Sequence, residues 1–176
     1  MTANAELEIV LVAAPLAHPM TTDVLQGLLY WAEERRDIRL RPELAGWSGD
    51  RSILERADGV LWGAGQDEET AAMLGELDCP VVLYTAKRRW PQFSLVTPDN
   101  VAVGRVAAEY LTTLGRPYYA GCMTWNSWFE QERLRGFQEV LTAKNISAEV
   151  HGPPPGLGSV GPMEITAWLE GMHRPA

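Results

Sequence analysis

The fold of this chain is decided by the stretch FSLVTPDN, residues 93–100, and by the helical pattern that follows it as far as Gly115. An apolar strand here passes directly into a helix, because Pro98 keeps the residue before it extended and Asp99 or Asn100 can accept hydrogen bonds from first-turn amides. Gly115 supplies the left-handed residue that ends the helix. Apolar side chains recur at intervals of three and four along this helix, so we expect that face to lie on a sheet. They are Val103, Val106, Ala107, Tyr110, Leu111 and Leu114.

Asp99 is the first candidate binding residue. It follows the carboxyl end of a strand, and in open α/β sheets ligands bind at that edge. The alternative is that Asp99 caps the helix, since the first amides of every helix need acceptors. If Asn100 is the cap instead, the Asp99 carboxylate can face a cleft. The two residues cannot both occupy the cap position.

Upstream of this stretch, strands and helices alternate. The expected strands are 9–14, 38–44, 59–64 and 81–85, and the expected helices between them are 21–35, 52–57 and 67–77. Such alternation predicts an α/β fold with a parallel, doubly wound sheet. Beyond Gly115 the pattern begins again, with strands at 118–123 and 146–151 and helices at 128–144 and 163–170.

The composition excludes several classes of protein. With 15 basic and 23 acidic residues among 176, the net charge is -8, which argues against nucleic-acid binding by this chain alone. Cys79 and Cys122 are far apart in the sequence and have neither zinc-site nor disulfide-framework spacing. The first apolar run, residues 9–15, follows no basic segment and is too short to span a bilayer. We therefore expect a cytoplasmic protein that has no membrane partner and no metal.

No side chain is placed for catalysis. His18, His151 and His173 are scattered, and none pairs with a nucleophile in a known motif. Gly63 and Gly65 lack the third glycine of a dinucleotide-binding loop and are followed by acidic residues that would repel a pyrophosphate. We expect no catalytic residue and no cofactor.

Tryptophans in strand-end loops are further candidates, since aromatic faces there can stack on sugar rings or flat ligands. They are Trp47, Trp62, Trp90, Trp125 and Trp128, and core packing is the alternative for each. Arg133 can reach a strand end and grip hydroxyls through its fork of donors, or it can simply lie on a charged helix surface. The basic run Lys87-Arg88-Arg89 is interpreted as a solvated loop.

Taken together, these motifs make the chain resemble the effector-binding region of the LacI/GalR family of transcription regulators. The resemblance is carried by TPDN at 97–100, Gly104, AAEYL at 107–111, Leu114-Gly115, and Arg133 with Gly136-Phe137. Earlier segments fit as well, namely DVLQG at 23–27, ADGVL at 57–61 and DCPVV at 78–82. Within the family the chain looks most like xylose-operon regulators, on the Asp-Asn pair, the Trp ahead of Arg133, and TAWL at 166–169.

This resemblance implies a periplasmic-binding-protein-like type I fold, with two Rossmann-like lobes and a sugar held between them. The first lobe would be residues 1–116 and a partial second lobe residues 117–176. The implied ligand-binding residues are Asp99, Arg133, His18, Met20 and Gly63, with Trp90 or Trp128 against the ring face of the sugar. Family members pair through first-lobe helices, so a homodimer is implied.

Two departures from the family and two rival interpretations remain. The chain begins directly at the first strand, without the family's helix-turn-helix domain, so DNA binding is expected only through a domain absent here. The second lobe is also expected to be incomplete. A transport-type sugar-binding protein would need a signal peptide, and a nucleotide-dependent enzyme on a Rossmann-like sheet would need a glycine fingerprint. The preferred hypothesis is a non-catalytic, sugar-sensing module that responds to a pentose such as xylose.

Overall fold

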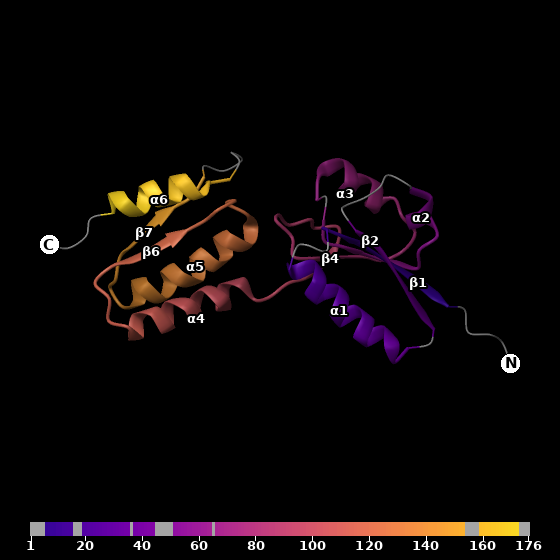
Figure 1. Ribbon diagram of the computed structural model, residues 1–176, viewed down its shortest axis with the longest axis horizontal. Helices are drawn as coiled ribbons and strands as arrows, with labels where there is room; N and C mark the ends of the chain where they lie inside the picture. Colours follow the sequence, from indigo (N-terminus) through magenta and orange to yellow (C-terminus); the bar gives the residue numbers. More distant parts are fainter. Residues whose placement is uncertain are drawn as a thin grey trace. The chain divides into compact units, whose positions relative to one another are not determined.

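The computed structural model describes residues 6–15, 19–35, 37–44, 51–64, 66–153 and 159–172. The chain divides into two compact units, Met1–Thr97 and Pro98–Ala176 (Figure 1). The division falls earlier than the predicted boundary at residue 116, because the helix that follows Asp99 packs within the second unit.

The first unit is a parallel sheet with the strand order β2-β1-β3-β4-β5. Its strands are β1 (Leu7–Ala13), β2 (Ile38–Leu44), β3 (Gly59–Trp62), β4 (Val81–Tyr84) and β5 (Ser94–Val96), and every neighbouring pair is parallel. The helices are α1 (Pro19–Glu33), α2 (Arg51–Glu55) and α3 (Glu68–Gly75). Figure 1 shows α1 on one side of the sheet and α2 and α3 on the other. The predicted parallel α/β sheet is confirmed.

The core of the first unit forms where the sequence predicts a strand buried on both faces. Residues 10–13 of β1 are all buried, as expected for a central strand covered by helices on each side. Trp62 at the end of β3 is fully buried and contacts the rings of Trp90 and Phe93 at centroid distances of 5.8 and 5.6 Å. Aromatic packing therefore closes the core close to the carboxyl edge of the sheet.

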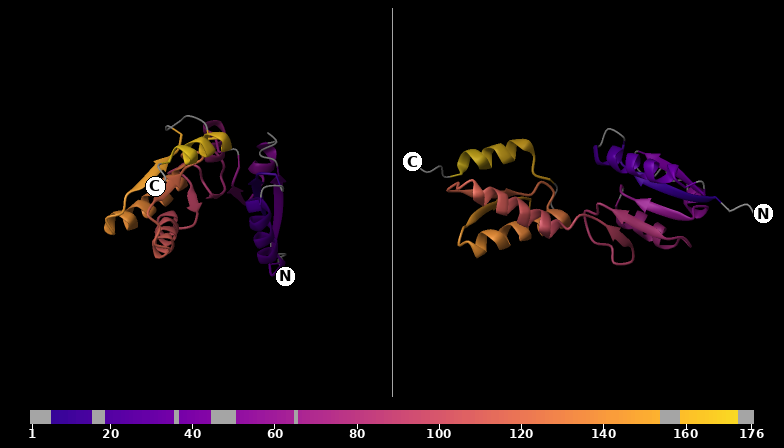
Figure 2. Two further views of the ribbon diagram at one scale, coloured as in Figure 1. Left: turned by 60° about the vertical axis from the view of Figure 1, so that its left-hand side comes forward. Right: turned by 90° about the horizontal axis from the view of Figure 1, so that it is seen from below.

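The second unit is a smaller three-layer arrangement. Strands β6 (Tyr119–Cys122) and β7 (Ala148–His151) pair in parallel, and the helices are α4 (Asn100–Thr113), α5 (Trp128–Ala143) and α6 (Pro162–Gly171). Figures 1 and 2 show α4 and α5 on one side of the two strands and α6 on the other. On the α6 side, His151 of β7 stacks on Trp168 with 4.9 Å between ring centroids.

The face of α4 that packs is different from the one predicted. Val106 and Tyr110 of the predicted apolar face are 64% and 65% exposed. The buried residues of α4 are instead Asn100, Gly104 and Ala108, which share a stripe at intervals of four residues. This stripe contacts α5, because its small side chains allow the two helix backbones to approach closely.

Two glycines make that approach possible. A Cβ atom on Gly104 would collide with the carbonyl of Arg133, and one on Gly136 would collide with the carbonyl of Val101. Both carbonyls belong to the facing helix, so neither collision could be relieved by turning a side chain. Tight packing of α4 on α5 is what assigns α4 to the second unit and moves the boundary to Thr97.

No described helix contains an apolar segment long enough to cross a bilayer.

Candidate functional site

Asp99 is the N-cap of α4. Its backbone is extended, and its Oδ1 accepts a hydrogen bond from the Ala102 amide at 2.9 Å. Asn100 is the first helical residue and is only 4% exposed. The alternative in which Asn100 caps the helix and leaves Asp99 uncommitted is therefore wrong, because the Asn100 side chain turns toward α5.

Arg133 meets Asn100 across the two packed helices. The Arg133 Nε donates to Asn100 Oδ1 at 2.9 Å, and its guanidinium lies 5.2 Å from the centre of the Phe129 ring. A hydrogen bond and a ring contact together restrict this long side chain, which would otherwise lose much rotamer freedom on binding a ligand. Arg133 is exposed, yet it is anchored and is not a loose surface residue.

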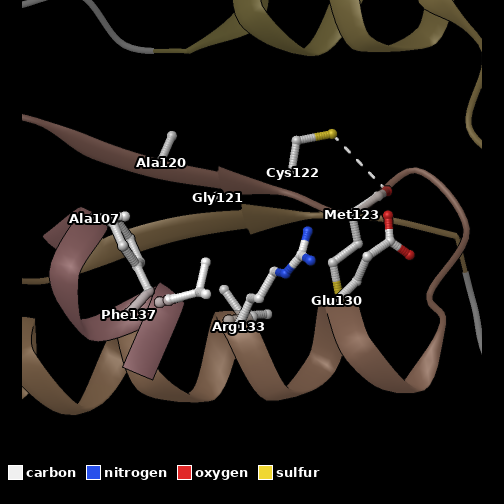
Figure 3. Close-up of a pocket in the computed structure, with 11 residues that line it drawn as sticks. Ala107, Ala120, Gly121, Cys122, Met123, Glu130, Arg133 and Phe137 are labelled. Carbon is white, nitrogen blue, oxygen red and sulfur yellow. Dashed lines mark hydrogen bonds between the residues drawn. The ribbon is translucent and has the colours of Figure 1, made fainter. Parts of the chain in front are cut away.

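A pocket of about 340 Å³ lies between α4, β6 and α5. This volume falls within the range of roughly 300–1,000 Å³ that is common for small-molecule sites. The lining is largely apolar, and its charged side chains are Glu130 and Arg133. Figure 3 shows the Arg133 guanidinium pointing toward Met123, at the carboxyl end of β6. The complete lining is Val103, Gly104, Ala107, Ala120, Gly121, Cys122, Met123, Glu130, Arg133, Leu134 and Phe137.

Glu130 organises the loop between β6 and α5. One carboxylate oxygen accepts hydrogen bonds from the Thr124 amide and hydroxyl at 2.9 and 2.8 Å. The other accepts from the Ser127 amide and hydroxyl at 2.9 and 2.8 Å. The Trp125 amide donates to both oxygens, at 3.3 and 3.2 Å. A single carboxylate thus holds three residues of this loop.

These contacts also change the acidity of Glu130. Partial burial alone would raise the pKa of its carboxyl group, but hydrogen bonds from Ser127 and Thr124 stabilise the charged form, and the net result is a lowered pKa. The carboxylate is therefore the form that maintains the loop.

Further contacts fix the middle of the same loop. Asn126 has a left-handed backbone, with φ at 48°, a conformation that Asn tolerates better than most residues. Its Nδ2 donates to the Pro153 carbonyl at 3.0 Å, and Gln131 donates to its backbone and side-chain oxygens at 3.1 and 2.9 Å. Trp125, which precedes Asn126, is 55% exposed on this held loop.

We predict that Glu130→Gln destabilises the second unit by about 2 kcal/mol at neutral pH, because an amide replaces an acceptor-only carboxylate. The pKa of folded Glu130 lies below its ordinary value of 4.5, so this stabilisation is present above about pH 4.5 and is lost as the pH falls through the folded value. Urea unfolding from neutral pH down to about pH 3 should show the stabilities of the wild-type protein and the Glu130→Gln variant converging.

Glu132→Gln is the matched control, since Glu132 lies on the same helix but pairs with the exposed Arg135 at 2.7 Å. Loss of the Glu132–Arg135 pair should lower the free energy of unfolding by less than about 0.5 kcal/mol, as is usual for exposed helical pairs. Equal effects of the two substitutions at neutral pH would contradict the role assigned to Glu130.

Apart from Trp125 and Trp128, the remaining candidate residues belong to the first unit or lie outside the described residues. His18 and Trp47 are in the latter group. Met20, the second residue of α1, is exposed. Gly63 follows β3, its amide donates to the Val12 carbonyl at 2.8 Å, and a Cβ there would collide with the ring of Tyr84.

Trp90 is a packing residue in the first unit. It is 6% exposed and contacts Trp62, and the Arg88 guanidinium lies over its ring at 4.1 Å. Arg88 is held there by Glu68 at 2.8 Å. Trp90 therefore does not expose the ring face expected of a ligand-binding residue. Arg88, which belongs to the basic run Lys87-Arg88-Arg89, packs on this ring. Trp128, the first residue of α5, is half-buried in the second unit.

Sequence reasoning missed Glu130 and the partnership of Asn100 with Arg133. The spacing of Ser127 and Glu130 is that of a capping box, a local signal that could have pointed to Glu130. Contact between Asn100 and Arg133 depends on helix packing and has no local signal. Among the described residues, no group of three or more His, Cys, Asp or Glu side chains is placed to hold a metal ion.

No protein-family model matches the sequence, and no curated protein matches it either. Several solved structures share its fold. A periplasmic ribose ABC transporter protein from Conexibacter woesei matches with a TM-score of 0.69 and 16% identity over 85% of this chain and 55% of that one. A LacI transcriptional regulator from Lactobacillus brevis matches with a TM-score of 0.60 and 19% identity over 81% of this chain and 56% of that one.

A third structure is that of a periplasmic binding protein/LacI transcriptional regulator from Alkaliphilus metalliredigens in complex with D-xylulofuranose. It matches with a TM-score of 0.58 and 16% identity over 83% of this chain and 56% of that one. At these identities the comparisons establish the periplasmic-binding-protein-like type I fold. The chain spans less than two thirds of the length of each of the three structures.

Proposed function

We propose that this chain is the sugar-binding part of an effector-sensing module in a LacI-type transcription regulator, and that it has no catalytic activity. The observation that carries the proposal is the Arg133 guanidinium, anchored by Asn100 and directed along a pocket at the carboxyl end of β6. A fork of fixed N–H donors beside an apolar lining suits a polyhydroxylated ring, which has hydroxyls at its edge and C–H groups on its faces. Fold likeness to regulators and sugar-binding proteins supports the same conclusion.

The other contacts follow from the family resemblance. Asp99 uses Oδ1 to cap α4, and we propose that its carboxylate also accepts a hydrogen bond from a sugar hydroxyl. Met20 and Gly63 would contribute from the first unit, together with His18, and Trp128 from the second. Of these, Asp99 is the contact that a single substitution tests most directly.

A pentose is the proposed ligand class. Two proteins that share the fold are a ribose transporter protein and a protein bound to D-xylulofuranose, which supports a five-carbon sugar such as xylose or ribose. As a regulator, the protein would act in the cytoplasm and contact DNA only through a helix-turn-helix domain attached to this module.

We also propose a homodimer formed through helices of the first unit. The exposed apolar residues of α1 support it, since Leu29, Tyr30 and Trp31 are 49%, 71% and 41% exposed. Sedimentation measurements on the chain would test this directly.

A transport-type binding protein is the second candidate function, and the ribose transporter likeness favours it. The two functions predict different cellular locations for the natural protein. Recovery of the protein from the periplasmic fraction would favour transport, and recovery from the cytosol would favour regulation.

The test is calorimetric titration of the chain with D-xylose, D-ribose and D-glucose. We expect binding of a pentose, and we expect Asp99→Ala to lower its affinity by about tenfold, the usual loss for one hydrogen bond to a charged group. Recovery of unchanged sugar after prolonged incubation would confirm the absence of catalysis.

Asp67→Ala is the matched control. Asp67 caps α3 in the first unit and accepts from the Thr70 amide at 2.7 Å, so its replacement removes the same kind of cap at a residue that is not among the proposed contacts. Both substitutions should cost about 1 kcal/mol of stability, and only Asp99→Ala should weaken binding. If the chain binds none of the three sugars, the proposed function is wrong.

A further inference from the structure

We propose that one side of α4 is a self-association surface, through which two copies of this chain pair with each other. It is made of apolar residues that recur at intervals of four, three and four, with a further apolar residue on each flank. They are Val103, Ala107, Tyr110 and Leu114, flanked by Val106 and Leu111, and we call these six residues the α4 seam. The contact is separate from the α1 contact proposed above, and the inference does not rest on sugar binding.

The α4 seam is exposed, although its pattern is that of a packed face. Tyr110 and Val106 are 65% and 64% exposed, and Leu114, Val103 and Leu111 are 46%, 43% and 37% exposed. A narrow apolar stripe with this spacing is the pattern by which one helix packs lengthwise against another. The contact with α5 does not fill that role, because α5 packs on the neighbouring stripe of small residues.

The exposed area of the α4 seam is sufficient for a contact between two copies. From the exposed fractions, the seam presents roughly 500 Å² of apolar surface, a size at which apolar patches mark interaction sites. Two seams that meet would bury roughly 1,000 Å² in total, which is the lower limit for a specific interface. A second copy therefore fits this surface, and the expected product is a weak, concentration-dependent dimer.

The charges of the chain also favour this surface for self-association. The net charge is -8, so most faces of two copies repel each other. The α4 seam contains no charged residue, and helical geometry places Arg105 and Glu109 on the other side of α4. Two seams can therefore meet without bringing like charges together and without burying an unpaired charge.

The α4 seam is held in place before pairing. The close approach at Gly104 and Gly136 fixes α4 on α5, so the seam belongs to a rigid helix and loses little freedom on association. Val103 and Ala107 of the seam also line the pocket, so a paired copy would border the pocket along α4. The charged pocket residues Glu130 and Arg133 lie on α5 and are not part of the seam (Figure 3).

The experiment is sedimentation equilibrium of the whole chain carrying Tyr30→Lys, which places a charge in the proposed α1 contact and leaves the α4 seam intact. We expect this chain to dimerise with a dissociation constant of about 10–100 μM, as suits an interface near the lower size limit. Adding Tyr110→Lys or Leu114→Lys should weaken dimerisation by at least about 100-fold, because a charge would be buried without a partner. Adding Met163→Lys should leave dimerisation unchanged. This is the matched control, since Met163 lies on α6 of the same unit and is 86% exposed.

The outcomes decide whether the α4 seam is the contact. Both seam substitutions are at exposed positions, and an unchanged far-UV circular dichroism spectrum would show that each variant is folded. If the Tyr30→Lys chain stays monomeric up to about 1 mM, the α4 seam does not pair two copies and the inference is wrong. Dimerisation that is equally strong with Tyr110→Lys, Leu114→Lys and Met163→Lys would also overturn it, because the copies would then pair through another surface.

Discussion

Replacing Arg133 by Ala is expected to lower the affinity of the chain for its pentose by about 100-fold, the cost of losing two hydrogen bonds from a charged donor. The expectation follows from how Arg133 is held. Its Nε is occupied by Asn100 at 2.9 Å, which leaves the guanidinium fork directed along the pocket beside β6. A group that is fixed before binding contributes more of its interaction energy to affinity. Calorimetric titration of the wild-type and variant chains measures the change.

Arg105→Ala is the matched control, since Arg105 also joins α4 to α5, through Glu139 at 2.6 Å. That pair is solvent-exposed and does not line the pocket, so its loss should cost less than about 1 kcal/mol of stability and leave affinity unchanged. Arg133→Lys keeps the charge without the fork and should bind with intermediate affinity. If Arg133→Ala binds within about threefold of the wild type while Arg133→Lys and Arg105→Ala do the same, Arg133 is not a binding residue.

The parallel sheet could be predicted from sequence because its signals are local. Residues 10–13 form an uninterrupted apolar run, which is typical of a strand covered on both faces, and the structure buries all four. Short strands separated by helical patterns leave few alternatives to a doubly wound sheet. The presence and type of each element followed from this periodicity.

The packing of α4 could not be predicted in the same way. Its sequence has two stripes, one of large apolar residues and one of Asn100, Gly104 and Ala108. Hydrophobic periodicity predicts that the stripe of larger side chains is the buried one. The structure buries the small stripe, because a second glycine, Gly136, lies on the facing helix. Close backbone approach depends on the matching of two distant segments, and neither segment alone reveals it.

The candidate site was predictable in part. Asp99 and Arg133 are proposed as binding residues from the strand-end position and the family resemblance, whereas the contact that anchors Arg133 required the arrangement of α4 on α5. Trp90 is an aromatic residue in a strand-end loop, but such a residue can point inward as readily as outward. The structure shows it buried beneath Arg88.

Gly104→Ala is expected to destabilise the second unit by about 3 kcal/mol, near the upper end of what overpacking usually costs. The added methyl group would meet the Arg133 carbonyl, a backbone atom of the facing helix that cannot rotate away. The two helices would have to separate, which would also lengthen the hydrogen bond from Arg133 to Asn100. We therefore expect sugar affinity to fall together with stability. Urea unfolding and calorimetric titration measure the two effects.

Gly27→Ala is the matched control for this substitution. Gly27 lies inside α1, and a Cβ there would meet no atom within 4 Å. Because Ala favours the helix over Gly, this variant should gain about 0.5–1 kcal/mol in stability and keep its affinity. Both substitutions add one methyl group to a helical glycine, so helix propensity alone would stabilise both variants. A stability loss in Gly104→Ala and a gain in Gly27→Ala would therefore show that the collision with the facing helix causes the loss. A stabilised Gly104→Ala protein would show that α4 and α5 do not pack through Gly104, and the anchoring of Arg133 by Asn100 would lose its structural basis.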